Sequence, residues 1–162
     1  MTFHIRRYEA RDAAAVRSIF IDAVTGIAPS GYSTAQVESW AAEAGSVADT
    51  HARCSDGRLV LIAADPADNP VAFTDLEDDG HIDMLFCTPG WAGRGVASAL
   101  YRELETLARR QNMKHLHVEA SEIARPFFAR HGFILTRRND FEIGGVAIHH
   151  YTMEKPLLQV RA

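Results

Sequence analysis

Cysteine is scarce in this sequence, which contains only Cys54 and Cys87 among its 162 residues. Two cysteines can form neither the disulfide framework of a small secreted protein nor a cysteine-based zinc cluster. Long apolar runs are also missing, because no stretch approaches the roughly 20 residues that a membrane-spanning helix needs. The opening residues, MTFHIRRYEARD, are charged and precede no apolar segment, so they do not resemble a secretory signal. We therefore expect a cytoplasmic protein with no membrane partner.

Basic runs are absent as well. The formal net charge is −4 and the sequence shows no basic stripe, which argues against a general binder of nucleic acid or of an anionic membrane surface. Internal repeats, low-complexity tracts and interdomain linkers are equally absent, and the length is sufficient for one buried core. We expect a single domain over residues 1–162.

The spacing of apolar residues predicts an alternation of strands and helices. A strand over residues 3–8 precedes two helices, which begin after Asp12 and, with a capping box, after Ser33. The period then changes, and turn sequences separate three apolar runs that indicate consecutive antiparallel strands. These runs are Leu59–Ala63, Val71–Leu76 and Ile82–Cys87.

The second half of the chain begins with a helix after Gly95. A strand over residues 114–120 and a helix that ends at Gly132 follow, and two last strands flank the turn dipeptide Gly144-Gly145. The order β-α-α-β-β-β-α-β-α-β-β predicts an α/β (α+β) fold with a mixed sheet of six to seven strands flanked by helices. The strand–helix–strand unit between residues 82 and 118 must be parallel and right-handed, because its crossover is a helix.

The segment CTPGWAGRGVASALYRELE places three glycines directly before a helical pattern. Such a turn either sets backbone dihedrals alone or forms an anion site, where the free N–H groups and the dipole of a helix N-terminus meet phosphate. Glycine serves an anion site because a Cβ would block the close approach of the backbone. A P-loop needs a following Lys-Ser/Thr, and a dinucleotide fold needs the full glycine pattern after the first strand, so neither fits.

The wider context resembles a known family. The segment IDMLFCTPGWAGRGVASALYRELETLARRQ resembles motif A of the GNAT superfamily of N-acetyltransferases, and ASEIARPFFARHGF resembles its second signature. Further shared residues, including MEK near the end and an early YS-x-x-Q-x-x-x-W, are most similar to the YafP-like branch. The resemblance spans the chain. It implies the GNAT acyl-CoA N-acyltransferase fold, with acetyl-CoA as cosubstrate, a small-molecule primary amine as acceptor, and direct transfer of the acetyl group in a ternary complex.

The resemblance also implies which residues bind the cofactor. The pyrophosphate is expected at the loop before the helix, the pantetheine arm at the backbone of the preceding strand, and further contacts at the second signature. The residues are Leu85, Phe86, Cys87, Ala92, Gly93, Arg94, Gly95, Val96, Ala97, Ser121 and Phe128. We expect no thiol chemistry at Cys87. Ser121 either caps its helix or touches the cofactor, and both remain open.

Two positions depart from the family pattern. Ala92 stands where Gln or Arg is usual, and Phe128 stands where the catalytic Tyr is usual. The first change costs little, because the phosphate contacts come mainly from backbone N–H groups. The second removes the expected acid, and we predict that Phe133 packs on Phe128 or on Phe127 at the helix end. Either Tyr151 or Tyr32 replaces that acid or, as we favour, no acid is needed, because a thiol pKa of about 8.5 makes the thiolate a tolerable leaving group.

The reaction also needs a base that takes a proton from the ammonium group. Asp83 and His81 precede the backbone site on the same strand with the parity of Leu85, and a water would relay the proton from either. Asp75 and Glu77 lie across the hairpin as reserves. The structural alternatives are a cap or loop brace for Asp83 and an exposed strand residue for His81. An Asp within a strand is unusual, which slightly favours a function.

Tyr32 and Trp40 flank the second short helix, which in this superfamily borders the acceptor site, although Trp40 fits a core position equally well. His115 and His117 lie on one face of a predicted strand, and His149 and His150 are adjacent in the last strand. The sequence places no carboxylate or cysteine partner for either pair, so we expect no metal. A catalytically weak acyl-CoA-binding or sensor domain, and an interaction module that has lost CoA, are the alternative functions. A homodimer formed through the terminal hairpin also stays open.

Overall fold

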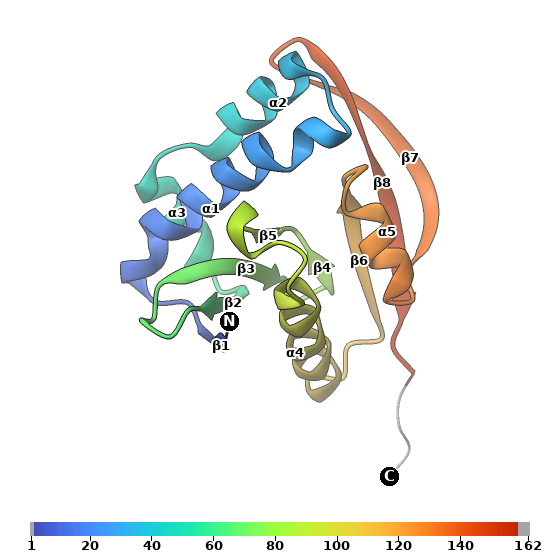
Figure 1. Cartoon of the computed structure of the whole chain (residues 1–162). Helices are drawn as coiled ribbons and strands as arrows, with labels where there is room; N and C mark the ends of the chain where they lie inside the picture. The colour runs from blue at the N-terminus through green and yellow to red at the C-terminus, as the bar shows by residue number, and fades with distance from the viewer. Residues whose placement is uncertain (1, 159–162) are drawn as a thin grey trace.

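The computed structural model describes residues 2–158. The strands are β1 (His4–Arg7), β2 (Leu59–Ala64), β3 (Pro70–Leu76), β4 (His81–Ile82), β5 (Leu85–Cys87), β6 (His115–Ala120), β7 (Ile134–Ile143) and β8 (Val146–Pro156). The α-helices are α1 (Ala13–Gly26), α2 (Thr34–Ala41), α3 (Val47–Cys54), α4 (Val96–Arg110) and α5 (Arg125–Arg130). Figure 1 shows α1 to α3 gathered on one side, with α4 on the other side of β3 and the long β7–β8 hairpin curving past α5.

The described strands form two four-stranded sheets, with the orders β1-β2-β3-β5 and β4-β6-β8-β7. The first sheet lies between two apolar cores, because alternate residues of a strand face opposite sides. In β2, Leu61 packs with the residues of α4, whereas Ile62 packs with those of α1. Both layers cover β2 so fully that its whole run LVLIAA is buried.

Several expected features are confirmed. Strand β4 pairs with β6 in parallel, and the turn between β7 and β8 contains Gly144 and Gly145. Gly132 adopts the left-handed conformation, with φ of 91°, at the end of α5. The ring centroids of Phe128 and Phe133 lie 5.1 Å apart, as the helix-end contact predicts.

Two features differ from the expectation. The chain forms an additional helix, α3, whose start is a capping box between Ser46 and Asp49. The expected strand Ile82–Cys87 is interrupted at Asp83-Met84, so β4 joins β6 and β5 joins β3. The mixed sheet therefore divides at this break, because the two short strands belong to different sheets.

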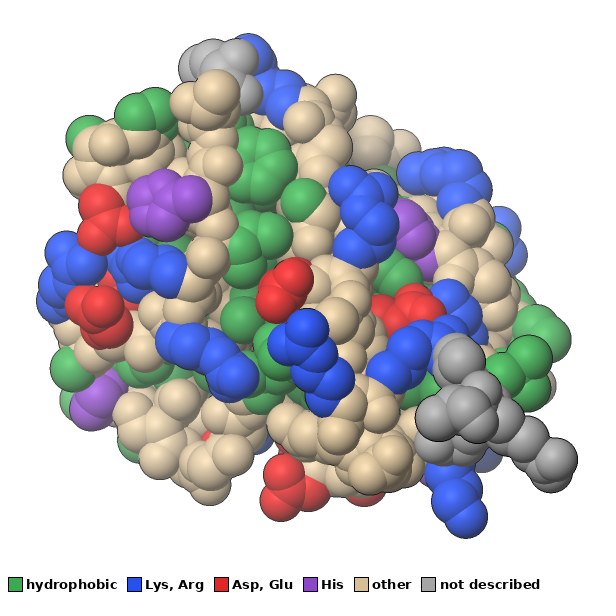
Figure 2. Space-filling model, turned by 90° about the horizontal axis from the view of Figure 1, so that it is seen from below, with side chains coloured by type: hydrophobic (Ala, Val, Ile, Leu, Met, Phe, Trp, Pro, Cys, Tyr) green, Lys and Arg blue, Asp and Glu red, His purple; other side chains and the backbone are tan. Residues whose placement is uncertain are grey.

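Charged side chains are mixed on the face shown in Figure 2. Lys and Arg side chains stand there in separate groups, with Asp and Glu side chains between several of them, around a central strip of hydrophobic side chains. Among residues 2–158, no helix combines the length and the apolar composition that crossing a membrane requires.

Candidate active site

The interruption between β4 and β5 shapes the centre of the site. The N–H of Asp75 in β3 donates to the carbonyl of Met84 (3.2 Å), and the N–H of Thr88 donates to the carbonyl of Val71 (2.9 Å). Residues of an antiparallel pair alternate between bonding and non-bonding positions. Between Met84 and Thr88, Leu85 and Cys87 occupy the non-bonding positions. Their backbone N–H and C=O groups therefore point away from β3. Since β5 is the edge of its sheet, these groups face the space that separates β5 from β6.

The glycine loop leads from β5 to the N-terminus of α4. Gly93 and Gly95 both adopt left-handed backbone conformations, with φ of 74° and 80°. A Cβ added at either position would meet no atom of the described chain within 4 Å. Gly95 is the N-cap of α4 and offers no side chain to the first helical N–H groups, and the Arg94 side chain folds back to donate to the Gly90 carbonyl (3.1 Å). The loop is thus an open, electropositive backbone surface at a helix start.

A cavity of about 540 Å³ opens beside the strand break. It brings together most of the acid–base and acceptor candidates and part of the cofactor set. The predicted residues that line it are Tyr32, Trp40, His81, Asp83, Leu85, Phe86, Ser121 and Phe128. The predicted residues of the described chain that lie outside its lining are Asp75, Glu77, Cys87, Tyr151 and residues 92–97.

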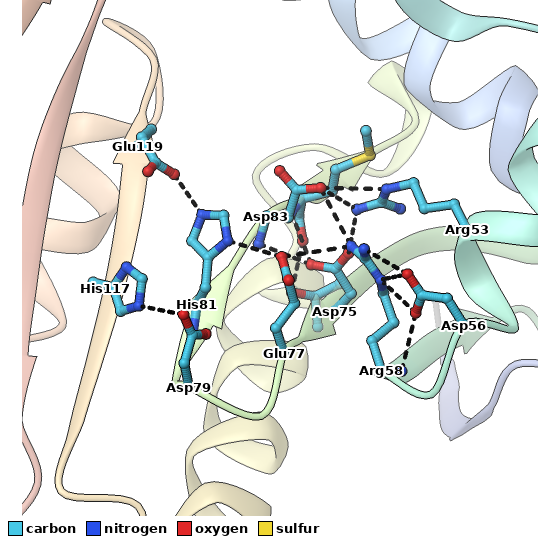
Figure 3. A network of polar contacts seen from close by, with 12 residues as sticks. Arg53, Asp56, Arg58, Asp75, Glu77, Asp79, His81, Asp83, His117 and Glu119 are labelled. Carbon is cyan, nitrogen blue, oxygen red and sulfur yellow. Dashed lines mark hydrogen bonds and ion pairs between the residues drawn. The ribbon is translucent and has the colours of Figure 1, made fainter.

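His81 lies between two carboxylates, as Figure 3 shows. Its Nδ1 is 2.8 Å from Glu77 Oε1, and its Nε2 is hydrogen-bonded to Glu119 Oε2. The hydrogen bond with Glu119, together with that to Glu77, raises the pKa of His81 to about 9 against the opposing effect of burial. The imidazole is therefore cationic at neutral pH, and its ring stacks on His117 with centroids 4.9 Å apart.

Asp83 and Asp75 meet two arginines on the other side of the break (Figure 3). Arg53 from α3 donates to Asp83 Oδ2 (2.7 Å) and also hydrogen-bonds to Asp75. Arg58 donates to Asp75 Oδ2 (2.9 Å). Burial raises the pKa of Asp83, but the hydrogen bond and charge of Arg53 outweigh it, so the pKa lies below the ordinary value. Asp83 is thus an ionised carboxylate in the cavity, whereas the side chain of Asp75 is fully buried.

The two tyrosines are held by the turn that follows β6. The Tyr32 hydroxyl accepts from the N–H of Glu122 (2.7 Å) and donates to the carbonyl of His149 (3.4 Å). The Tyr151 hydroxyl donates to Glu122 Oε2 (2.8 Å), and Arg125 lies over its ring. Burial raises the pKa of Tyr32, and the hydrogen bond to Glu122 raises that of Tyr151. Both hydroxyls are therefore engaged in protein contacts.

Three cofactor candidates have clear structural contacts. Phe128 is 2% exposed and packs against the rings of Phe127 and Phe133. Ser121 accepts from the N–H of Ala124 (3.1 Å), so it caps this turn while it also lines the cavity. Burial raises the pKa of the Cys87 thiol to about 11, which keeps it protonated.

The comparisons with known proteins agree with this geometry. The family model described as the acetyltransferase (GNAT) domain matches residues 29–155. The uncharacterized N-acetyltransferase YafP of Escherichia coli (strain K12) is 34% identical over 149 residues, which are 92% of this chain and 93% of that protein. The chain belongs to the GNAT acetyltransferase family. The expected similarity to the YafP-like branch is confirmed, and the protein is an N-acetyltransferase.

Two solved structures of GNAT proteins extend the comparison. The GCN5-related N-acetyltransferase of Rhodopseudomonas palustris is 37% identical, with a TM-score of 0.89 over 97% of each chain. The phosphinothricin acetyltransferase of Sinorhizobium meliloti, solved in complex with acetyl-CoA, is 19% identical, with a TM-score of 0.75 over 97% of this chain and 89% of that chain. The second likeness establishes the GNAT fold alone, because the identity is low.

The structure of this GNAT protein adds cavity residues that sequence reasoning missed. Glu119 on β6 reaches His81, and the C-terminal hairpin supplies one wall of the cavity. The residues of that hairpin are Arg137, Asn139, Phe141, Ile143, Ile148, His149, His150 and Thr152. The four odd-numbered residues of β7 in this set alternate along the strand, which was the available signal. Within residues 2–158, no three His, Cys, Asp or Glu side chains are grouped closely enough to hold a metal ion.

Proposed function

We propose that this domain, over residues 1–162, transfers the acetyl group of acetyl-CoA to the primary amine of a small molecule, directly within a ternary complex. The observation that carries this proposal is the edge of β5. Its Leu85 and Cys87 backbone groups face the gap toward β6 beside the cavity, next to the open glycine loop. An acyl-CoA needs this combination, because its pyrophosphate and its amide-containing arm require backbone donors and acceptors a short distance apart.

The residues present fit acetyl-CoA. The open space above Gly93 and Gly95 admits phosphate oxygens to the N–H groups of Gly95, Val96 and Ala97, and the α4 dipole favours their charge. Ala92 leaves this backbone surface intact. The presence of acetyl-CoA in the S. meliloti acetyltransferase, which shares the fold, supports the same cosubstrate here.

Bound acetyl-CoA supplies an activated acetyl thioester. The backbone groups of the β5 edge would hold the cofactor arm and orient the thioester carbonyl, and their N–H donors favour the charge that develops on its oxygen. Ser121 lines the same cavity, so its hydroxyl would be a further hydrogen-bonding group for the bound cofactor. The same hydroxyl also caps the turn after β6 by accepting from the N–H of Ala124.

In this proposal Asp83 binds the amine and His81 accepts its proton. Asp83 is ionised and lines the cavity, so it would bind the incoming ammonium group. A carboxyl group with an ordinary pKa of about 4 is a poor match for an alkylammonium of about 10.4, since the proton transfer is uphill by at least about 8 kcal/mol. The pKa of His81, about 9, lies much closer. We therefore assign proton acceptance to the neutral form of His81 beside Glu119, a form that is a minor species at pH 7 and increases as the pH rises toward 9. Asp83 remains the counter-charge.

No acid is assigned to the departing thiolate. Phe128 is packed between aromatic rings, and the hydroxyls of Tyr32 and Tyr151 are bound by the turn at Glu122. A thiol pKa of about 8.5 allows the thiolate to leave without a proton donor.

The decisive experiment has two steps. Calorimetry with acetyl-CoA should show binding, and a thiol-reactive dye should then detect free CoA when primary amines are added. Amines with an apolar body come first, because Phe20, Trp40 and Phe141 line the cavity. Binding without CoA release from any amine would favour the sensor domain, and a lack of binding would favour the interaction module.

The assignment of the base has its own test. With an acceptor amine whose pKa lies well below 9, turnover of the wild type should rise with pH toward the pKa of His81, about 9. His81→Gln should lose this rise. Asp83→Asn should lower turnover while changing acetyl-CoA affinity little, and full turnover in Asp83→Asn would leave the amine without its proposed counter-charge. Location in the cytoplasm and a homodimer remain predictions that fractionation and size-exclusion chromatography would check.

A further inference from the structure

Asp75 is a fully buried carboxylate at the break between β4 and β5. Its Oδ1 accepts hydrogen bonds from the N–H groups of both Asp83 and Met84, each at 2.9 Å. Its Oδ2 faces the guanidinium groups of Arg53 and Arg58. A buried charge is tolerated when it is paired and hydrogen-bonded, and this carboxylate meets both conditions.

The double acceptance by one oxygen determines the course of the chain. In a regular strand, consecutive N–H groups point to opposite sides, so a single acceptor cannot bind both. Here the N–H groups of Asp83 and Met84 converge on Asp75, and the strand must turn between them. The hydroxyl of Thr74 fixes the same turn from the other end by donating to the carbonyl of Met84 (2.9 Å).

The turn has a consequence for the site. Because the chain bends away at Met84, β5 no longer follows β4 along β6, and its edge is exposed toward the cavity. Arg53 also links the turn to the cavity, since its guanidinium contacts both Asp75 and Asp83. The position of the Leu85 and Cys87 backbone groups therefore depends on a carboxylate that lies outside the cavity lining.

We propose that Asp75 is a positioning residue for acetyl transfer, which holds the strand break open and so presents the β5 edge to acetyl-CoA, with Arg53 and Arg58 stabilising its charge. Asp75 touches neither reactant. This role rests on the proposed function, because it takes the β5 edge as the place where the cofactor arm binds. In this proposal Asp75 positions the β5 edge and no longer serves as a reserve base for the amine.

The test compares Asp75→Asn with a matched control, Asp12→Asn. Asp12 is also a buried carboxylate (2% exposed) that binds an arginine, Arg6, and accepts a backbone N–H, that of Glu9. Both variants should lower the melting temperature. Only Asp75→Asn should lower kcat/KM for acetyl-CoA, by roughly tenfold or more, because it weakens charge-assisted hydrogen bonds that orient the site.

Two further measurements separate positioning from loss of stability. Amide hydrogen exchange followed by NMR should show faster exchange at Asp83 and Met84 in Asp75→Asn and unchanged exchange there in Asp12→Asn. The affinity for the nucleotide fragment of CoA, which lacks the pantetheine arm, should stay within about twofold of the wild type in both variants, since the glycine loop is untouched.

A milder variant decides the question if Asp75→Asn does not fold. Thr74→Val keeps the side-chain shape and removes one hydrogen bond to Met84, so we expect the same effect on kcat/KM at a smaller size. Wild-type kinetic constants and wild-type amide exchange in these variants would overturn the positioning role. A wild-type protein that binds no acetyl-CoA would instead overturn the proposed function, and the exchange data would still report whether Asp75 holds the turn.

Discussion

Replacement of Gly95 by leucine tests the cofactor loop most directly. Gly95 has φ of 80° and ψ of 6° and forms the N-cap of α4. A side chain in this left-handed conformation costs roughly 1–2 kcal/mol whatever surrounds it. No atom of the described chain lies within 4 Å of the added Cβ, so we expect no steric penalty from the protein itself. The leucine would occupy the space that the proposal gives to the pyrophosphate.

The size of the effect on binding follows from the contacts at stake. Hydrogen bonds to a charged group contribute about 1.5–3 kcal/mol each, and a leucine at Gly95 would disrupt one or two of them. We therefore expect at least about a tenfold loss of acetyl-CoA affinity, and more than about a hundredfold if two such bonds are lost, since each factor of ten corresponds to about 1.4 kcal/mol. Isothermal titration calorimetry well below the melting temperature measures this loss.

A matched control separates strain from obstruction. Gly145 in the β7–β8 turn has φ of 81° and equally open space around an added Cβ. Gly145→Leu should therefore be destabilised by a similar amount and should bind acetyl-CoA within about twofold of the wild type. Unchanged affinity in Gly95→Leu would refute the loop assignment, and equal losses in both variants would show that strain alone explains the effect.

The remaining predictions concern His81 and Phe128. The folded-state pKa of His81, about 9, exceeds its ordinary value of 6.5, so its stabilising contribution should be complete below about pH 6.5 and disappear as the pH rises through 9. Urea titrations measure the free energy of unfolding at each pH. The difference in this free energy between wild type and His81→Gln should narrow by up to about 3 kcal/mol from pH 6.5 to pH 9. A difference that does not change with pH would contradict this. Phe128→Ala should lose about 3–5 kcal/mol of unfolding free energy, whereas Phe128→Tyr should not increase kcat; a rise in kcat would show that the reaction lacks an acid.

Local patterns predicted most of the regular structure. The period of apolar residues placed α1 and α4, and strand-like runs placed β2, β3 and β6. Helix α3 was missed although its capping box, Ser46 with Asp49, was readable, because the helix is only eight residues long and Cys54 is the one buried residue among them. The interruption at Asp83-Met84 was beyond such patterns, since the apolar run Ile82–Cys87 favours one strand and the cause of the break lies on β3.

For the candidate site, too, some features could be predicted from the sequence and others could not. The glycine loop and the residues flanking it were predictable, because positive φ at a helix start requires glycine and the motif is contiguous. The environments of His81 and Asp83 were not. Their protonation depends on Glu119 and Arg53, which are 38 and 30 residues away in the chain.

The sequence by itself therefore determined most of the elements, their order, the family and the open loop at Gly95, since all of these depend on local backbone preference and short-range spacing. Only the tertiary structure decided that the sheet divides at Asp83-Met84, that Asp75 is a buried brace, and that His81 carries a proton at neutral pH. Those properties come from contacts between distant segments, where burial and neighbouring charges set hydrogen bonding and pKa.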